Sequence, residues 1–241
     1  METKNSGMKF YSLGIVAANK ALNSKVIECT PIEDSPMSDG QLTSQVTTTT
    51  TKSQKADGTP YHISINQTNT ISATWIPLGD SNRQTAPDVR RGETVMIYRF
   101  ADQDKYYWQE YSFDLNLRKL ETVVHAYSGT QDEGASTTGE NSYFTEISTH
   151  EGIAHLHTSK ANGEPFGYDI QVNAKTGFIQ IQDDVGNTFS LNSVNSQLEM
   201  INKNGSLVNI QGPNITINAP GTINITAGSA INITSPNTNI N

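Results

Sequence analysis

The chain contains little of what usually stabilises a self-contained globular domain. Among its 241 residues Cys29 is the only cysteine, which excludes an intrachain disulfide and a cysteine-based zinc site. Hydrophobic residues make up 34% of the sequence and aromatic residues 7%, a thin supply for a core built within one chain. We therefore expect another chain to complete part of the hydrophobic core.

Positive charge is also scarce. The sequence has 16 Lys and Arg residues against 24 Asp and Glu residues, a formal net charge of -8, and the basic residues do not cluster. Nucleic acids and anionic membranes select for basic clusters, so we expect no nucleic-acid partner and no electrostatic attraction to a membrane. From Asn204 to Asn241 there is no charged residue and no histidine. Such a tail has no ions to desolvate in a lipid layer, although tight packing of small residues explains it equally well.

Long hydrophobic runs are missing as well, and none approaches the roughly 20 residues that a membrane-spanning helix needs. The apolar run from Phe10 to Ala18 superficially resembles a signal peptide. Ser12 and Gly14 interrupt this run, however, and its alternation fits the opening strand of a barrel. The sequence therefore predicts a soluble protein that is synthesised in the cytoplasm of its producer.

The N-terminal part of the chain consists of short segments rich in Val, Ile, Thr, Tyr and Trp, separated by turn signals. Strands are expected near residues 11–18, 24–30, 42–52, 61–66, 70–76, 93–100 and 105–112. Asp57-Gly58 indicates a turn, and residues 115–127 fit either a helix or a strand, of which we favour the strand. Because five or six strands suffice to close a small barrel, the sequence predicts an all-β barrel domain over residues 1–127.

A polar stretch without periodicity, residues 128–141, predicts a linker to a second domain over residues 142–241. In this second domain, pairs of the form apolar-x-apolar recur at a spacing that narrows from nine or ten residues to eight. The paired residues are Ile170 and Val172, Ile179 and Ile181, Phe189 and Leu191, Leu198 and Met200, Val208 and Ile210, Ile215 and Ile217, Ile223 and Ile225, and Ile231 and Ile233. Each pair predicts one short strand followed by a turn.

Alternation along a strand directs both apolar side chains of a pair to one face and the intervening polar residue to the other. A single ribbon of such strands cannot enclose its apolar face, whereas three copies wound around a shared axis can. We therefore predict that the second domain is an intertwined trimeric β-helix and that the sixteen paired residues form the core of a homotrimer.

Three stretches resemble one family, the central spike and baseplate hub proteins of contractile-tailed bacteriophages, which are related to type VI secretion spikes. GETVMIYRFADQDKYYW at 92–108 resembles the OB-fold barrel of these proteins. GFIQIQDDVGNTF at 177–189 resembles the opening turns of their β-helix, and the octads after Pro213 (NITINAPG, TINITAGS and AINITSPN) resemble its shaft. The resemblance covers both predicted domains.

This resemblance implies an N-terminal OB-fold followed by a trimeric β-helix needle, in a virion, at the distal end of the tail. The barrel would dock on a baseplate hub protein, and a separate small protein would sharpen the C-terminal tip. Contraction of the sheath would drive the needle through the host outer membrane. The best-known family member carries a lysozyme domain between barrel and needle, where this chain has only residues 128–141. We therefore expect a structural protein with no catalytic residues and no cofactor.

Two other functions remain open at this point. A tailspike that degrades surface polysaccharide would need a longer helical body with acidic grooves. A trimeric fibre tip that binds a receptor would need a globular head at the C-terminus. The repeat continues to the end of the sequence, which favours the spike.

His155-Leu156-His157, with His150 nearby, is the one group of residues that indicates a metal. Residues i and i+2 of a strand point the same way, so threefold symmetry would gather six imidazoles. Some members of the family hold iron at the spike apex with such a pair, but their motif lies near the C-terminus. We therefore favour ordinary surface or interface histidines and keep a metal site as the alternative.

The remaining candidates favour structural roles. The paired carboxylates are Asp183-Asp184, Asp102 with Asp104, and Asp132-Glu133. Asp183-Asp184 precedes Val185-Gly186-Asn187, which predicts a hairpin turn rather than a glycosidase pair. Tyr106-Tyr107-Trp108 is typical of a stacking platform for nucleic acid or sugar, yet only Lys105 accompanies it, so packing within the barrel or against a hub is favoured.

Overall fold

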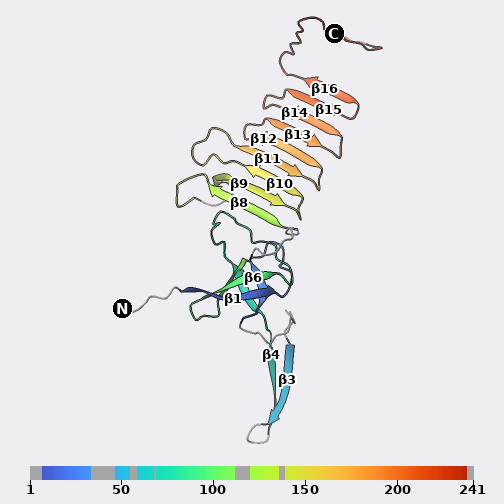
Figure 1. Ribbon diagram of the computed structural model, residues 1–241. Coiled ribbons are helices and arrows are strands. Elements are labelled where there is room, and N and C mark those ends of the chain that lie inside the picture. Colours follow the sequence, from blue (N-terminus) through green and yellow to red (C-terminus); the bar gives the residue numbers. More distant parts are fainter. Residues whose placement is uncertain are drawn as a thin grey trace.

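The computed structural model describes residues 7–33, 47–54, 59–67, 69–111, 120–135 and 139–237. These residues form β-strands and one short 3-10 helix, η1 (Gly139–Asn141), which confirms the predicted all-β class. A closed barrel lies next to a long sheet that extends away from it towards the C-terminus (Figure 1). Within the described part of the chain, no helix has the length and hydropathy of a membrane span.

Five strands close the barrel: β1 (Met8–Val16), β2 (Val26–Pro31), β5 (Ile71–Trp75), β6 (Thr94–Phe100) and β7 (Tyr106–Glu110). Their order is β1-β2-β5-β7-β6, and β6 pairs back to β1. β5 and β7 are parallel, whereas the other neighbours are antiparallel. The predicted closed barrel is thus confirmed. The two other strands expected in this region, β3 (Thr47–Gln54) and β4 (Pro60–Gln67), pair only with each other, and the predicted Asp57-Gly58 turn lies outside the described residues.

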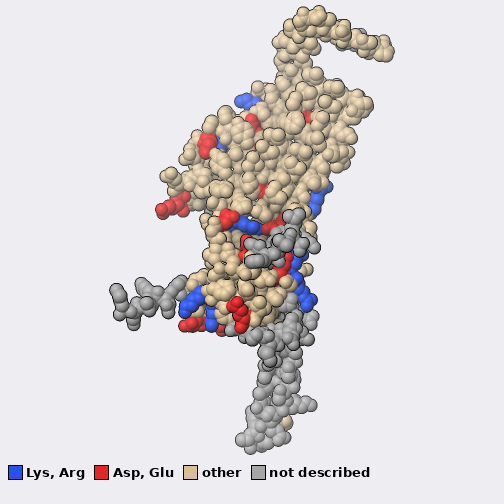
Figure 2. Space-filling view, in the orientation of Figure 1, with Lys and Arg blue, Asp and Glu red and all other residues tan. Residues whose placement is uncertain are grey.

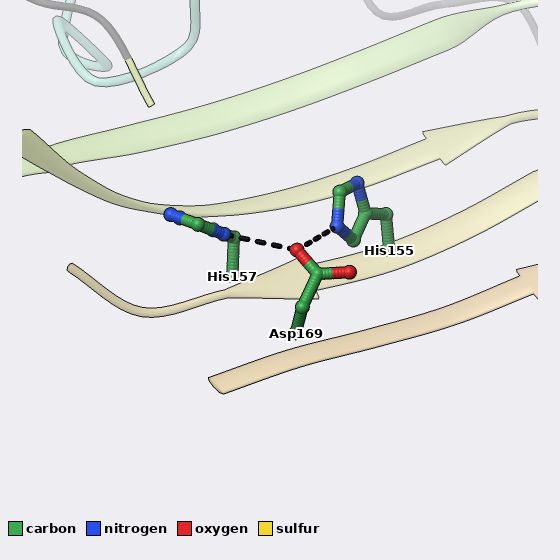
Figure 3. Close-up of side chains that lie close together, drawn as sticks. All are labelled: His155, His157 and Asp169. Atoms are coloured by element: carbon green, nitrogen blue, oxygen red, sulfur yellow. Dashed lines mark hydrogen bonds and ion pairs between the residues drawn. The ribbon is translucent and has the colours of Figure 1, made fainter. Parts of the chain in front are cut away.

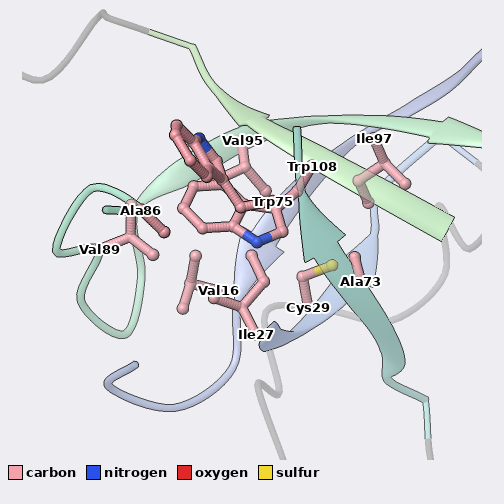
Figure 4. Packing of buried hydrophobic residues seen from close by; sticks show 10 residues of the cluster. All are labelled: Val16, Ile27, Cys29, Ala73, Trp75, Ala86, Val89, Val95, Ile97 and Trp108. Atoms are coloured by element: carbon pink, nitrogen blue, oxygen red, sulfur yellow. The ribbon is translucent and has the colours of Figure 1, made fainter. Parts of the chain in front are cut away.

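The barrel interior contains the hydrophobic core (Figure 4). Its members alternate along the strands, so that each strand directs every second side chain inward. The core consists of Val16, Ile27, Cys29, Ala73, Trp75, Ala86, Val89, Val95, Ile97 and Trp108. Trp108 is fully buried, and its indole N–H donates a hydrogen bond of 3.1 Å to the Lys25 carbonyl oxygen. Because complete burial of one large apolar side chain contributes about 1.5 to 3 kcal/mol, this cluster is the main source of barrel stability.

Cys29 provides a direct test of barrel integrity. Its thiol is fully buried in the core, and this burial, with a smaller contribution from the Glu28 carboxylate, raises the pKa of Cys29 to about 12. Since only the thiolate reacts with disulfide reagents, native protein should show no labelling by a thiol reagent near neutral pH. Full labelling, one group per chain, should appear only after denaturant unfolds the barrel. Rapid labelling of the native protein would contradict the buried position of Cys29.

Nine strands form the long sheet: β8 (Thr122–Ser128), β9 (Ser142–Ser148), β10 (Ile153–His157), β11 (Tyr168–Asn173), β12 (Phe178–Asp183), β13 (Thr188–Asn192), β14 (Gln197–Ile201), β15 (Leu207–Gln211) and β16 (Asn214–Asn218). They follow one another in sequence order, and each is antiparallel to the next. Within one chain the repeat therefore forms a ladder of hairpins, and the intertwined β-helix stays a prediction.

The turn between β12 and β13 explains how such tight hairpins form. Asp183 Oδ1 accepts backbone hydrogen bonds from Val185, Gly186 and Asn187, at 3.1, 2.9 and 2.8 Å. The hydrogen bond from the Asn187 side chain, together with these backbone bonds, lowers the pKa of Asp183. Gly186 has a φ of 103°, a region that residues with a Cβ rarely adopt. The hairpin turn predicted here is therefore confirmed.

The boundary between barrel and repeat lies earlier than the predicted residue 127. Residues 122–128 form β8, which pairs with β9 in the long sheet and not with any barrel strand. Residues 128–141 consequently connect two neighbouring strands of one sheet, so the interpretation as a linker between domains was wrong. The pairing of β8 with β9 runs without interruption from Thr122 opposite Ser148 to Ser128 opposite Ser142. Alternation within residues 122–128 marks a strand but does not tell which sheet the strand joins.

The last two predicted strands of the repeat do not form. Residues 219–237 contain no strand, and they leave the sheet beyond β16 (Figure 1). Ile223, Ile225, Ile231 and Ile233 are accordingly exposed. A strand is stable only when a neighbour pairs with its backbone, and in the described chain nothing pairs with β16 on its outer side. The octad pattern alone therefore does not produce strands within a single chain.

A loop from the barrel covers the first edge of the long sheet. The Gln84 N–H donates to the Val124 carbonyl oxygen at 2.8 Å, and the Ala126 N–H donates to the Asn82 carbonyl oxygen at 3.0 Å. These bonds use backbone groups of β8 that would otherwise face solvent. The loop between β5 and β6 thus connects the barrel to the sheet as a short additional strand would.

Charged side chains lie in the junction between barrel and sheet. Arg83 forms an ion pair with Glu121, and Lys20 Nζ donates hydrogen bonds of 3.1 Å to the carbonyl oxygens of Ala21 and Ser24. Lys20 and Glu121 help to line a cavity of about 260 Å³. Burial lowers the pKa of Lys20 despite the carboxylates nearby. The contact between barrel and sheet is therefore polar, and the Lys20 side chain in it is largely removed from water.

Candidate functional site

The largest candidate surface is the apolar face of the long sheet. Directly opposite residues of neighbouring strands share a face, and the pairing registers align the predicted core residues in two columns. The first column is Val172, Ile179, Leu191, Leu198, Ile210 and Ile215. The second column is Ile170, Ile181, Phe189, Met200, Val208 and Ile217. Twelve of the sixteen predicted core residues thus form one continuous apolar surface.

The sequence analysis missed the start of both columns. Ala154 lies opposite Val172 and Ile147, and Leu156 lies opposite Ile170. The first column therefore continues through Ala154 to Ile147 on β9, whereas the second ends at Leu156 on β10, opposite Thr145 on β9. The alternation of Ala154 and Leu156 with the polar residues His155 and His157 is the sequence signal for this extension.

These columns are exposed in the single chain. Ile215 is 69% exposed and Phe189 is 41% exposed, and Ile170, Val172, Ile181, Leu198, Met200, Ile210 and Ile217 are exposed as well. Monomeric soluble proteins rarely expose apolar patches larger than a few hundred square ångströms, and longer patches mark interaction surfaces. No part of the described chain covers this face. The surface is therefore suited to association with another apolar surface.

The opposite face of the sheet is mainly polar. Gln180, Ser190, Glu199, Asn209 and Thr216 lie opposite one another in turn, in a line that runs from β12 to β16. Figure 2 shows charged side chains gathered over the barrel and its junction, with few over the later strands and none on the tail. The long sheet is therefore amphipathic: its polar face can be solvated, and its apolar face is suited to burial.

A second candidate site is a cluster of two histidines and one aspartate (Figure 3). His155 and His157 are on β10, and Asp169 lies opposite His157 on β11. His155 Nε2 lies 2.9 Å and His157 Nδ1 3.0 Å from the same oxygen, Asp169 Oδ2. Sequence reasoning found the histidine pair but missed Asp169, because only the register between the strands brings the carboxylate to it.

The cluster lies on the polar face of the sheet. Leu156, between the two histidines, belongs to an apolar column, so His155 and His157 point to the opposite side. Burial opposes ionisation of Asp169, but hydrogen bonds from His157 and His155 lower its pKa. If the apolar columns face a trimer axis, six imidazoles do not gather at that axis. The predicted threefold arrangement of the histidines is thus incompatible with the predicted core.

Packing holds the imidazoles in place. The Phe144 ring stacks on His157 at a centroid distance of 4.9 Å and meets His155 edge-on at 5.0 Å. His157 Nε2 lies 3.0 Å from the carbonyl oxygen of Gly139. The side of the cluster formed by His157 and Asp169 borders a cavity of about 330 Å³, which Lys160, Asp183 and Asp184 also line. The cluster is therefore fixed in position and accessible to a small solute.

The predicted carboxylate pairs have structural partners. Asp183 caps its hairpin turn, and Asp184 forms an ion pair with Lys160 and accepts a hydrogen bond from the Gly167 N–H at 3.1 Å. Asp104 pairs with Arg99 at 3.3 Å. These contacts give the three carboxylates structural roles in the loops that contain them.

Asp132, from the third predicted carboxylate pair, accepts a hydrogen bond of 2.9 Å from the Gly134 N–H. It therefore stabilises the connection between β8 and β9.

The aromatic run on β7 also has a structural explanation. Trp108 is in the barrel core, and the Tyr106 ring lies 5.2 Å from the Tyr11 ring. Arg99 lies over the Tyr106 ring, and Lys105 lies over the Tyr107 ring. Packing in and around the barrel accounts for these rings, in agreement with the favoured interpretation.

No protein-family model matches this sequence, and no curated protein matches it at a significant level.

Proposed function

We propose that this chain is the central spike of a contractile phage tail, a structural homotrimer that punctures the host outer membrane on sheath contraction. The observation that carries the proposal is the pair of apolar columns on one exposed face of a long hairpin ladder. Three such faces turned towards a common axis would bury the columns and leave the polar faces outside. A rod built this way is stiff, which is the property a spike needs.

The barrel supports the same proposal through its topology. Around the barrel the strand order is β1-β2-β5-β7-β6. Counted along the chain, these are the first, second, third, fifth and fourth barrel strands, and the third (β5) and fifth (β7) are parallel. This is the Greek-key connectivity of a five-stranded OB-fold barrel. The resemblance of residues 92–108 to the OB-folds of hub and spike proteins is consistent with it. The barrel would dock on the baseplate hub.

The C-terminal residues also support a needle that three copies of the chain form together. Residues 219–237 keep the octad pattern but have no pairing partner among the residues that the structure describes. Strands supplied by two other copies would provide those partners and bury Ile223, Ile225, Ile231 and Ile233 with the columns. The absence of charge after Lys203 suits passage through lipid, and a separate protein would complete the tip.

The solution mass of the full chain tests the assembly. Light scattering should give three times the 26.3 kDa chain mass, because the columns are buried only when three copies meet. The trimer band should also persist on an SDS gel run without boiling. A mass of 26.3 kDa would contradict both the proposed shared core and the proposed spike function.

Location tests the function separately from the assembly. Antibodies raised against the barrel should label the distal end of contractile tails in particles from producing cells. Labelling elsewhere on the particle, with a trimeric mass, would retain the trimer and refute the central spike.

A further inference from the structure

We propose that His155, His157 and Asp169 bind one divalent transition-metal ion, Zn²⁺ in the first place, on the polar face of the long sheet. All three ligands come from neighbouring strands of one chain. The site therefore does not rest on the proposed trimer.

The positions of the three ligand atoms fit a small ion. His155 Nε2, His157 Nδ1 and Asp169 Oδ2 all lie within 4.8 Å of one another. Zinc–ligand distances of about 2.0 to 2.2 Å in a tetrahedral site place neighbouring ligand atoms roughly 3.3 Å apart. Because the two N···O separations are 2.9 and 3.0 Å, a slight outward movement would admit the ion.

The hydrogen-bond partners of His157 favour positive charge between its ring and Asp169. Its Nε2 faces the Gly139 carbonyl oxygen, which can only accept, so Nε2 must carry the proton. In a neutral imidazole Nδ1 then presents a lone pair to Asp169 Oδ2, which is also an acceptor, at 3.0 Å. Such an acceptor–acceptor contact is unfavourable, and positive charge between the two atoms removes it. That charge is either a second proton on the His157 ring, which gives a hydrogen bond to Asp169, or a metal ion bound to both atoms.

The surroundings resemble those of ligating histidines. Such histidines commonly donate their second ring N–H to a backbone carbonyl, which fixes the tautomer and orients the lone pair, as Gly139 does for His157. The side chains of His155, His157 and Asp169 are 15%, 26% and 29% exposed, so water is partly excluded. Phe144 restricts both rings.

The ligand set favours zinc over calcium or magnesium. Two imidazoles and one carboxylate suit zinc and similar transition metals, whereas calcium and magnesium select oxygen ligands. Three protein ligands leave a fourth position, which faces the adjacent cavity and would hold water. Through Gly139 the ion would link β10 and β11 to the connection after β8. It would thus reinforce the start of the ladder.

Titration of the metal-free full chain with ZnCl₂ in a calorimeter tests the site. We expect one Zn²⁺ per chain. Asp169→Asn should weaken binding more than roughly tenfold, because the amide cannot replace a carboxylate ligand. The same substitution should not unfold the protein, since the new amide N–H can donate to His157 Nδ1. Co²⁺ should give the visible absorption bands of a four-coordinate site in the wild type but not in this variant.

His125→Gln is the matched control, because His125 Nε2 lies 3.0 Å from Asp80 Oδ2 in a histidine–aspartate pair without a second imidazole. This variant should bind Zn²⁺ as the wild type does. No Zn²⁺ binding by the wild type, unchanged binding by Asp169→Asn, or equal loss in His125→Gln would each overturn the proposal. A stoichiometry of one ion per three chains would overturn it too.

Discussion

A lysine in place of Phe189 is expected to abolish the proposed trimer, whereas a lysine in place of the adjacent Ser190 is expected to leave it intact. Both substitutions introduce the same side chain into β13. Phe189 belongs to an apolar column, and Ser190 lies on the polar face opposite Glu199. The two variants therefore place the same charge on opposite faces of one strand.

The expected difference is large. Three copies of Phe189→Lys would place three unpaired ammonium groups near the trimer axis, at an effective cost of several kcal/mol each. That total matches or exceeds the roughly 5 to 15 kcal/mol by which folded proteins are usually stable. In the single chain Phe189 is 41% exposed, so a lysine there costs little without a trimer. Ser190→Lys instead gains Glu199 as a partner.

Light scattering of both variants beside the wild type makes the comparison. We expect the Phe189→Lys chain to appear as a 26.3 kDa species or as aggregate, and the Ser190→Lys chain to keep the wild-type mass. A Phe189→Lys protein with unchanged mass would show that the columns are not the assembly surface. Loss of the trimer in both variants would show that β13 tolerates no lysine, and it too would contradict the assignment of the faces.

Trp108→Ala is expected to destabilise the barrel by about 3 to 5 kcal/mol, the usual cost of removing a buried aromatic side chain. Trp108 is fully buried among the core residues, and the change to Ala removes both the packing of its ring and its hydrogen bond to the Lys25 carbonyl oxygen. Both tryptophans of the chain, Trp75 and Trp108, are in this core. Tryptophan emission therefore follows the unfolding of the barrel alone, and Trp75 remains as the reporter in the variant.

Trp108→Phe is the control for this change. It keeps most of the apolar volume but loses the hydrogen bond to the Lys25 carbonyl oxygen, at a cost of about 1 to 3 kcal/mol. The urea midpoints should rank wild type, Trp108→Phe and Trp108→Ala in decreasing order. An alanine variant with the wild-type midpoint would mean that the ring does not fill the barrel centre.

The barrel strands were predictable because alternation and β-branched or aromatic residues mark each of them locally. The predicted segments 93–100 and 105–112 correspond to β6 and β7, and 70–76 corresponds to β5. The closing order was not predictable, since pairing between β5 and β7 depends on contacts far apart in the sequence. For the same reason the sequence did not separate β3 and β4 from the barrel.

Two features of the site needed three-dimensional information. Residues 122–128 alternate like a barrel strand, and only their register with β9 assigns them to the long sheet. Asp169 has no sequence signal that links it to His155 and His157, because its place beside them follows from the pairing of β10 with β11. The apolar columns, in contrast, were visible in the spacing, because the repeat fixes the face of each residue.

The tail shows a different limit of sequence reasoning. Its octads predict strands as clearly as the earlier pairs do, yet Ile223 and Ile231 lie in residues without strand structure. Side-chain alternation specifies which face a residue will occupy, but hydrogen-bond partners decide whether a strand exists. For these residues the partners are not in the described chain.

The barrel loop at β8 makes the two edges of the long sheet different. The Val124 carbonyl oxygen and the Ala126 N–H, which face outward from β8, are already hydrogen-bonded to Gln84 and Asn82, so another strand cannot pair with β8 there. β16 has no such cover. In the described structure, a further strand could therefore pair with the long sheet only at β16. A second copy could pair with the β8 edge only after displacing this loop, so the loop protects that edge from pairing between chains.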